Sequence, residues 1–146
     1  MTKTVKTMRE FNSLLTANSY SRQYEDGHFA GWDTKRLWRL ADAERVIVAK
    51  TAQFQPTIDK WMDFESTTHP DGRVTVEFDV NHFLRIRNAQ LKYPIIVEAD
   101  GVWVMDGMHR LMKCYLGNID TIRVVQFAVT PEPDFVYYPK NEVRMW

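Results

Sequence analysis

The stretch that decides the fold runs from Val102 to Gly117 and reads VWVMDGMHRLMKCYLG. Its first four residues are β-branched or large and apolar, which predicts a strand. Asp106-Gly107 then ends the strand, because this pair is typical of a turn. From Met108 to Leu116 the apolar residues recur at helical spacing, and Gly117 is expected to end the helix in the left-handed conformation. The stretch therefore predicts a strand, a glycine turn and a helix in direct succession.

Further strands and helices are predicted on both sides of this stretch. Apolar runs or alternation predict strands over residues 46–49, 74–79, 95–97 and 121–129. Helical spacing predicts helices over residues 33–45, with Asp33 as N-cap, and 82–91, with Asn81 as N-cap. Residues 19–32 show no period and are predicted to be a loop. The fold of residues 1–32 as a whole is left open.

Strands that alternate with helices predict an α/β (α+β) fold. We expect one compact domain over residues 1–146, with a small mixed sheet and helices packed on it. Its core is expected at residues 74–127, and an aromatic tail at 130–146 is compatible with docking to a partner.

Composition narrows the class of protein. Nineteen Lys and Arg balance nineteen Asp and Glu, whereas a non-specific DNA-binding protein usually carries a basic surplus. Cys114 is the single cysteine, so the chain can form neither an internal disulfide nor a cysteine-rich zinc site. Residues 1–6 lack the apolar segment of a signal peptide, and no apolar run reaches the roughly 20 residues that cross a bilayer. A cytoplasmic protein without membrane contact is expected.

The turn at residues 106–110 has the features of an anion site. A helix start presents free N–H groups and the positive end of the helix dipole, and Gly107 lets a ligand approach the backbone. His109 and Arg110 add side-chain donors, and the Arg fork matches phosphate oxygens. Asp106 has three roles open to it: a ligand of Mg²⁺, a proton acceptor, or a simple helix cap. A plain surface turn would share most of these residues.

Other polar residues lie at spacings that would bring them to this turn. His82 and Arg85 are three residues apart, so they share one face of the predicted helix. Lys113 follows Arg110 at the same spacing. Each of these residues can either contact a phosphate or lie on a solvated face. Glu77 and Asp79 alternate on the predicted strand over residues 74–79, and a solvent-facing strand explains them.

The ordered motifs from Tyr93 to Gly117 resemble those of a known superfamily. They are Tyr93-Pro94-Ile95-Ile96-Val97, Asp100-Gly101 and Met105-Asp106-Gly107-Met108-His109-Arg110-Leu111, followed by Lys113 and Gly117. This pattern resembles the ParB/sulfiredoxin superfamily, and most closely its small stand-alone ParB-like proteins of bacteria and phages. The resemblance covers about residues 74–127. It implies a ParB/sulfiredoxin-like fold with a nucleotide-binding core.

The branches of this superfamily imply different activities. Sulfiredoxins place a catalytic cysteine just before the His-Arg pair, where this chain has Met108. Partition ParB proteins carry a helix-turn-helix region after the core, and only about 20 residues follow Phe127 here. Free serine kinases of this fold use the same phosphate turn with an acidic catalytic residue. The resemblance therefore favours a kinase-like activity over a cysteine-based one.

Together these features predict a nucleotide-dependent enzyme, most simply a phosphotransferase that uses ATP or another nucleotide, with or without Mg²⁺. The predicted catalytic residues are Asp106 and His109, and Asp106 is also the candidate Mg²⁺ ligand. The predicted phosphate-binding residues are Gly107, Met108, His109, Arg110, Lys113, His82 and Arg85. The alternative is a non-catalytic regulatory module, compatible with a phage origin, that binds a nucleotide, DNA or a protein partner. A nuclease is not favoured.

Overall fold

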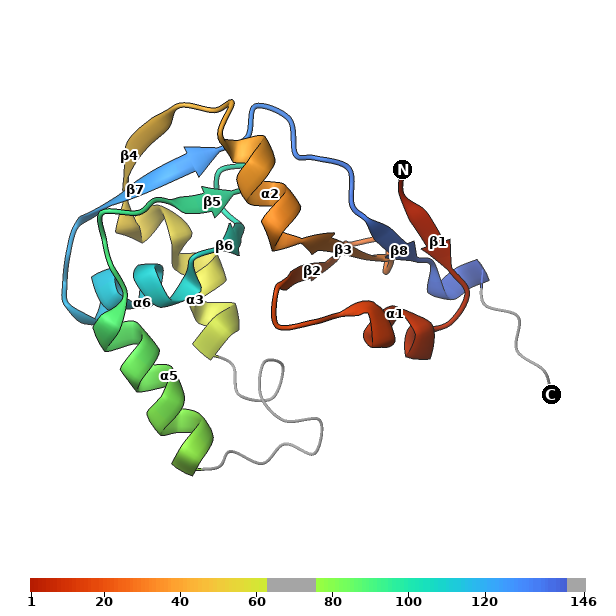
Figure 1. The fold of residues 1–146 in the computed structure, drawn as a ribbon, viewed down its shortest axis with the longest axis horizontal. Helices are drawn as coiled ribbons and strands as arrows, with labels where there is room; N and C mark the ends of the chain where they lie inside the picture. The colour runs from red at the N-terminus through yellow and green to blue at the C-terminus, as the bar shows by residue number, and fades with distance from the viewer. Residues whose placement is uncertain (63–75, 142–146) are drawn as a thin grey trace. The chain divides into compact units, whose positions relative to one another are not determined.

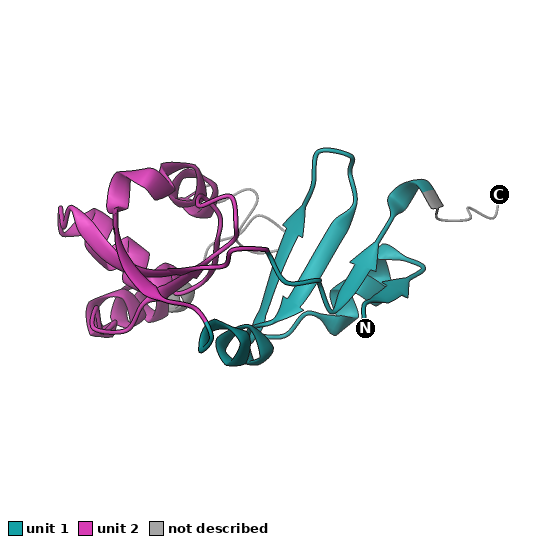
Figure 2. Cartoon of the chain, turned by 90° about the horizontal axis from the view of Figure 1, so that it is seen from above, with its two compact units in different colours: residues 1–43, 130–146 teal, residues 44–129 magenta. Residues whose placement is uncertain are grey.

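The computed structural model describes residues 1–62 and 76–141 and divides the chain into two compact units. Unit 1 comprises residues 1–43 and 130–146, and unit 2 comprises residues 44–129 (Figure 2). Each unit has its own four-stranded mixed sheet, where the sequence predicted a single sheet. The predicted core at 74–127 falls in unit 2, and the predicted tail belongs to unit 1. Within the described ranges, no helix is long and apolar enough to cross a bilayer.

Unit 2 contains the strand, turn and helix that the sequence predicted. Its strands lie in the order β4-β7-β5-β6 (Figure 1): β4 (Val46–Lys50), β7 (Thr121–Gln126), β5 (Ile95–Val97) and β6 (Val104–Asp106). β5 and β7 are parallel, and the other neighbours are antiparallel. Its helices are η1 (Thr51–Phe54), α3 (Gln55–Met62), α5 (Val76–Asn88) and α6 (Met108–Leu116). β6 therefore ends one residue before Gly107, and α6 begins one residue after it.

The core of unit 2 lies between its sheet and its helices. All three residues of β5 are buried, as expected for a central strand that is covered on both faces. Phe54 and Leu111 contribute fully buried side chains from the helical side of this core. Cys114 is buried in the same cluster, so its thiol is a packing group, as its place in the predicted helix suggested.

The prediction of a strand over residues 74–79 is wrong from residue 76 onward. Val76 to Asp79 form the first turn of α5, and Asn81 lies inside this helix instead of capping it. Apolar residues at 74, 76 and 78 fit a strand period, whereas those at 76, 80, 83 and 84 fit only a helical period. The predicted strand face with Glu77 and Asp79 therefore does not exist. Residues 69–72 read His-Pro-Asp-Gly, which predicts a turn, and lie outside the described residues.

The C-terminal end of α6 also differs from the prediction. Gly117 has φ −88°, and the next residue, Asn118, takes the left-handed conformation with φ 53°. Asparagine is one of the few residues that tolerate this conformation. The Ile119 N–H donates to the Cys114 carbonyl at 2.8 Å, which closes the helix end around Asn118. Gly117 is thus the C-cap of α6 and lies outside the left-handed region, and the chain reverses one residue later.

Unit 1 corrects the prediction of a loop over residues 19–32. Its strands lie in the order β1-β8-β3-β2: β1 (Lys3–Val5), β8 (Phe135–Tyr137), β3 (Phe29–Asp33) and β2 (Ser19–Gln23). β2 and β3 form an antiparallel hairpin whose turn contains Gly27 at φ 92°. β2 is an edge strand with half-exposed and exposed side chains, so its sequence lacks a clear apolar alternation.

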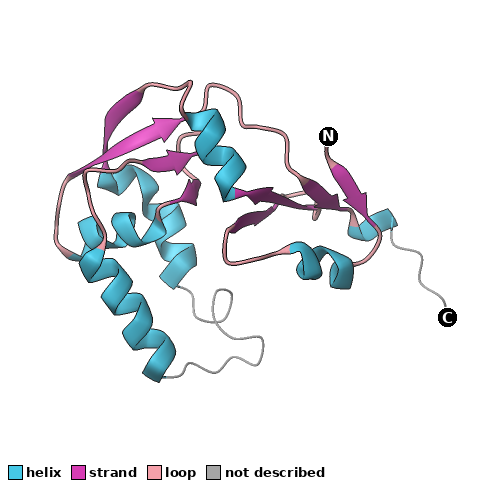
Figure 3. Ribbon diagram, in the orientation of Figure 1, coloured by secondary structure: helices cyan, strands magenta, loops and turns pink. Residues whose placement is uncertain are grey.

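The predicted aromatic tail is partly a strand of the unit 1 sheet. β8 lies between β1 and β3, pairing parallel with the first and antiparallel with the second. Phe135 and Tyr137 are buried with Phe11 of α1 (Met8–Leu14) in one cluster, and the Phe11 and Phe135 rings meet edge-on with their centroids 5.0 Å apart. Phe135 and Tyr137 are therefore not available for docking. Figure 3 shows α1 as a helix and β1, β3 and β8 as strands. Trp146 lies outside the described residues.

Helix α2 (Thr34–Ala41) follows β3 directly and begins as predicted. The Asp33 carboxylate accepts the Lys35 N–H at 3.0 Å, which confirms Asp33 as the N-cap. The helix ends at Ala41, four residues before the predicted end. Arg36 extends from α2 to the Asp134 carboxylate at 2.9 Å, which links the helix to the chain segment before β8.

Candidate functional site

The turn between β6 and α6 is built on a conformation that favours glycine. Gly107 has φ 98° and ψ 23°, and a Cβ at this position would lie 2.7 Å from Cγ2 of Ile95. Its N–H donates to the Asp106 carboxylate at 2.9 Å. Its carbonyl accepts the N–H groups of Arg110 and Leu111. The first N–H groups of α6 are therefore held at a fixed position beside β5 and β6.

Two histidines meet beside this turn. His82 of α5 and His109 of α6 place Nδ1 and Nε2 3.1 Å apart, and their rings stack with centroids separated by 5.4 Å. A contact of this length requires one proton between the two nitrogens, so one ring donates and the other accepts. The structure thus brings together two residues that the sequence placed on separate elements, 27 positions apart.

Trp61 is a third member of this cluster, although no pattern in the sequence singles it out. Its ring lies edge-on to both histidines, with centroid distances of 5.3 Å to His82 and 6.0 Å to His109. Trp61 belongs to α3, whose place beside α5 and α6 depends on tertiary packing. An isolated tryptophan in a short helix is usually a core residue, and no motif around Trp61 signals otherwise.

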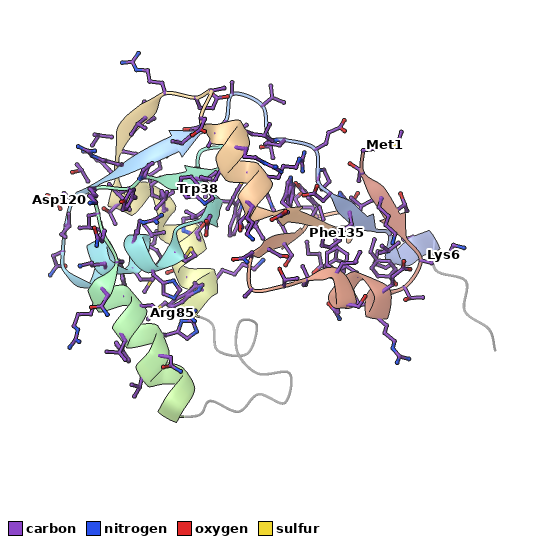
Figure 4. The ribbon with its side chains drawn as sticks, in the orientation of Figure 1. Met1, Lys6, Trp38, Arg85, Asp120 and Phe135 are labelled. Carbon is purple, nitrogen blue, oxygen red and sulfur yellow. The ribbon has the colours of Figure 1, made fainter. Side chains whose placement is uncertain are left out.

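Electrostatics at His109 reveal a basic environment. Burial lowers the pKa of His109 below 6.5, and the charges of His82, Arg85 and Arg110 lower it further. Asp106 is the one group acting in the opposite direction. Arg85 lies near the C-terminal end of α5 (Figure 4). Among the described groups that act on His109, bases therefore outnumber acids, and a bound anion would relieve their mutual repulsion.

The lowered pKa of His109 predicts a loss of stability toward acid pH. The unfolded chain takes up a proton near pH 6.5 while the folded protein still resists it, so the free energy of unfolding falls as the pH drops below 6.5. The loss stops once the pH lies below the folded-state pKa. Denaturant titrations between about pH 5 and 8 should show this slope in the wild type and a flatter profile in His109→Gln. Equal slopes in both proteins would contradict the assignment.

Arg110 and Lys113 have structural hydrogen bonds. Nη1 of Arg110 donates to the Pro94 carbonyl at 3.1 Å, and its guanidinium lies 5.7 Å from the centre of the Tyr93 ring. Nζ of Lys113 donates to the carbonyls of Arg87 and Ala89, both at 2.8 Å. These carbonyls end α5, where cations are favoured by the helix dipole. Lys113 thus fastens α5 to α6 and holds His82 next to His109.

Loss of the two hydrogen bonds from Lys113 to the end of α5 should destabilise unit 2. We expect Lys113→Met to lower the free energy of unfolding by about 1–3 kcal/mol, because two carbonyls lose a charged donor. Lys92→Met is a suitable control, since the Lys92 side chain is exposed and, among the interactions described, its ammonium group contacts the Tyr93 ring alone. Urea denaturation measures both variants. An equal effect of both substitutions would show that the two hydrogen bonds contribute nothing specific.

The β6–α6 turn offers one carboxylate, that of Asp106, to a divalent cation. Within residues 1–62 and 76–141, no group of three or more His, Cys, Asp or Glu side chains is arranged to hold a metal. Mg²⁺ commonly binds through one or two carboxylates together with substrate phosphates and water. Asp106 fits this kind of shared site.

No protein-family model, no curated protein and no solved structure matches the chain.

Proposed function

We propose that unit 2 binds the phosphates of a nucleotide at the β6–α6 turn and transfers a phosphoryl group to a hydroxyl acceptor. The observation that carries this proposal is the gathering of basic groups at the start of α6, where Nδ1 of His82 lies 3.1 Å from Nε2 of His109 and the charges of Arg85 and Arg110 also act on His109. A site of this kind gains most from a ligand with several negative charges. The resemblance of residues 93–117 to the ParB/sulfiredoxin superfamily supports the same assignment.

Different groups at the turn would contact different parts of the bound phosphates. The first N–H groups of α6, at Met108 and His109, would hold phosphate oxygens at the positive end of the helix dipole. Arg85 and His82 would approach from α5. Gly107 would give the turn the left-handed conformation that places these N–H groups, and a side chain here would collide with Ile95. Lys113 would act indirectly, by holding α5 in place.

Phosphoryl transfer requires a proton acceptor and charge stabilisation near the transferred group. The acceptor hydroxyl would lose its proton to the Asp106 carboxylate or to neutral His109, its oxygen would bond to the γ-phosphorus, and the nucleoside diphosphate would leave. When present, Mg²⁺ would neutralise charge on the phosphates beside Asp106. The lowered pKa keeps His109 neutral at pH 7, as a proton acceptor requires.

The second candidate is a module that binds the nucleotide without turnover. One observation favours it: the Asp106 carboxylate already accepts the Gly107 N–H at 2.9 Å, as a structural cap would. In this case Asp106 stabilises the turn, and the bound nucleotide or nucleic-acid phosphate regulates contact with a partner. Binding is common to both candidates, and turnover separates them.

Binding is tested by calorimetry with Mg-ATP on a matched pair of variants. Arg85 and Arg87 are both exposed in the last turn of α5, and only Arg85 acts on His109. We expect Arg85→Gln to weaken binding about tenfold, the effect of one charged hydrogen bond, and Arg87→Gln to change it less than twofold. Absence of binding by the wild type, or equal effects of the two substitutions, would overturn the site.

Turnover is tested with the same nucleotide and a panel of hydroxyl compounds. If unit 2 is an enzyme, Asp106→Asn should lower product formation from Mg-ATP about 100-fold, because general-base catalysis contributes on this order, while the Kd for ATP without Mg²⁺ changes little. Wild-type protein that binds Mg-ATP without consuming it would select the non-catalytic module.

A further inference from the structure

Strand β4 forms an outer edge of the unit 2 sheet and carries exposed apolar side chains. Among the described strands it pairs with β7 alone, in unbroken register from Val46 to Lys50. Val46, Ile47 and Val48 are 49%, 40% and 66% exposed. Edge strands of monomeric proteins are usually protected by a charge, a proline or a bulge. Of the five residues of β4 only the last, Lys50, is charged, and residues 46–49 contain neither a charge nor a proline, so this part of the edge is open to another strand.

Both faces of a strand added at this edge would meet apolar side chains. Ile47 pairs with Val124, a core residue, and therefore lies on the face that the helices of unit 2 cover. Val46 and Val48 lie on the opposite face. An occupant of this edge must therefore be apolar at successive positions and not only at alternate ones.

The sequence of this edge is complementary to a second copy of itself. Residues 44–50 read ERVIVAK. In an antiparallel pair centred on Ile47, the two copies of Ile47 lie opposite each other and Val46 lies opposite Val48. Glu44 then lies opposite Lys50, so each end of the pair carries opposite charges, which stabilise such a register.

Neighbouring registers are less favourable. A register centred on Val46 places Val48 opposite Glu44, and one centred on Val48 places Val46 opposite Lys50. A centre between Ile47 and Val48 places Arg45 opposite Lys50, which is repulsive, and puts the helix-covered faces of the two copies on opposite sides. The register centred on Ile47 matches residues 46–48 of the two copies with one another and leaves Arg45 opposite Ala49. Extended two residues beyond β4, it also places Glu44 opposite Lys50.

We propose that two copies of the chain associate through antiparallel pairing of β4, centred on Ile47. The two four-stranded sheets of unit 2 would become one sheet of eight strands. This dimer does not depend on the function of the β6–α6 turn, because none of the residues assigned to that turn lies on β4.

Charge reversal tests the proposed register. Light scattering at increasing concentration should reveal a species of twice the 17.3 kDa chain mass that dissociates on dilution. Glu44→Lys and Lys50→Glu should each weaken the dimer about tenfold, since each creates two like-charge pairs. The double variant Glu44→Lys/Lys50→Glu should restore it. A protein that stays monomeric at all concentrations, or a dimer that the double variant does not restore, would overturn the proposal.

Cysteine cross-linking tests the centre of the pair. Under mild oxidation Ile47→Cys should form a covalent dimer, because opposite residues lie within the distance that a disulfide spans. Val46→Cys is the matched control, since its two copies would be displaced by two residues, and wild type controls for Cys114. Cross-linking through Val46→Cys instead would overturn the register. A monomer whose β4 amides are protected from hydrogen exchange would assign the edge to another segment, and would also overturn the proposal.

Discussion

Gly107→Ala is expected to destabilise unit 2 by about 2–5 kcal/mol. The left-handed conformation costs a residue with a Cβ about 1–2 kcal/mol, and overpacking in a dense core adds about 1–3 kcal/mol. Both apply here, because Gly107 has φ 98° and its Cβ would lie 2.7 Å from Cγ2 and 3.2 Å from the backbone Cα of Ile95. Ile95 is fully buried in β5 and cannot move aside. Urea denaturation followed by tryptophan fluorescence measures the loss.

Gly27→Ala is the matched control for this substitution. Gly27 has a similar φ of 92°, but a Cβ there would meet nothing within 4 Å. We therefore expect the conformational cost alone, about 1–2 kcal/mol, partly offset by the lower entropy of the unfolded chain. If both substitutions cost the same, the contact with Ile95 is not what requires a glycine at residue 107.

Gly31→Ala should destabilise unit 1 by about 3 kcal/mol, for a steric reason alone. Gly31 pairs with Phe135 across β3 and β8, and a Cβ on Gly31 would overlap the Phe135 ring. This ring is buried and packs edge-on against Phe11 at 5.0 Å, so it cannot swing away. Thermal unfolding monitored by near-ultraviolet circular dichroism measures the loss.

A double-mutant cycle with Phe135→Leu tests this explanation. Leucine is shorter than phenylalanine, so it leaves room for the new methyl group. In the Phe135→Leu background we expect Gly31→Ala to cost less than about 1 kcal/mol, which corresponds to a coupling energy of about 2 kcal/mol. Additive effects would place the cost in the backbone of β3 instead of the aromatic contact.

The sequence predicted best the elements whose residues are fully buried or sharply punctuated. β5 is a continuous apolar run, and the β6–α6 turn carries Asp-Gly, so both were found near their observed positions. The hairpin of β2 and β3 was missed because β2 is a half-exposed edge strand with polar residues at most positions. The first turn of α5 was mistaken for a strand because its apolar residues, Val76 and Phe78, are two positions apart. The helical spacing becomes clear only when the apolar residues at 80, 83 and 84 are included.

The spacing of residues along the sequence predicted only some of the residues of the candidate site. His82 and Arg85 were selected because they are three positions apart, and residues at this spacing lie on the same face of a helix. Trp61 contacts both histidines, but α3 reaches them through packing that no local pattern encodes. The hydrogen bonds of Lys113 to the end of α5 could not be predicted from the sequence either, because they depend on the path of the chain between two helices.

The place of β8 in the unit 1 sheet bears on how the chain acquires its structure during synthesis. β8 lies between β1 and β3, so the sheet lacks an internal strand until residues 135–137 leave the ribosome. All of unit 2 is made before then, so it can fold first. Until then the residues of β1, β3 and α1 that pack against β8 stay uncovered in the nascent chain, which is the condition under which incomplete domains are prone to aggregate.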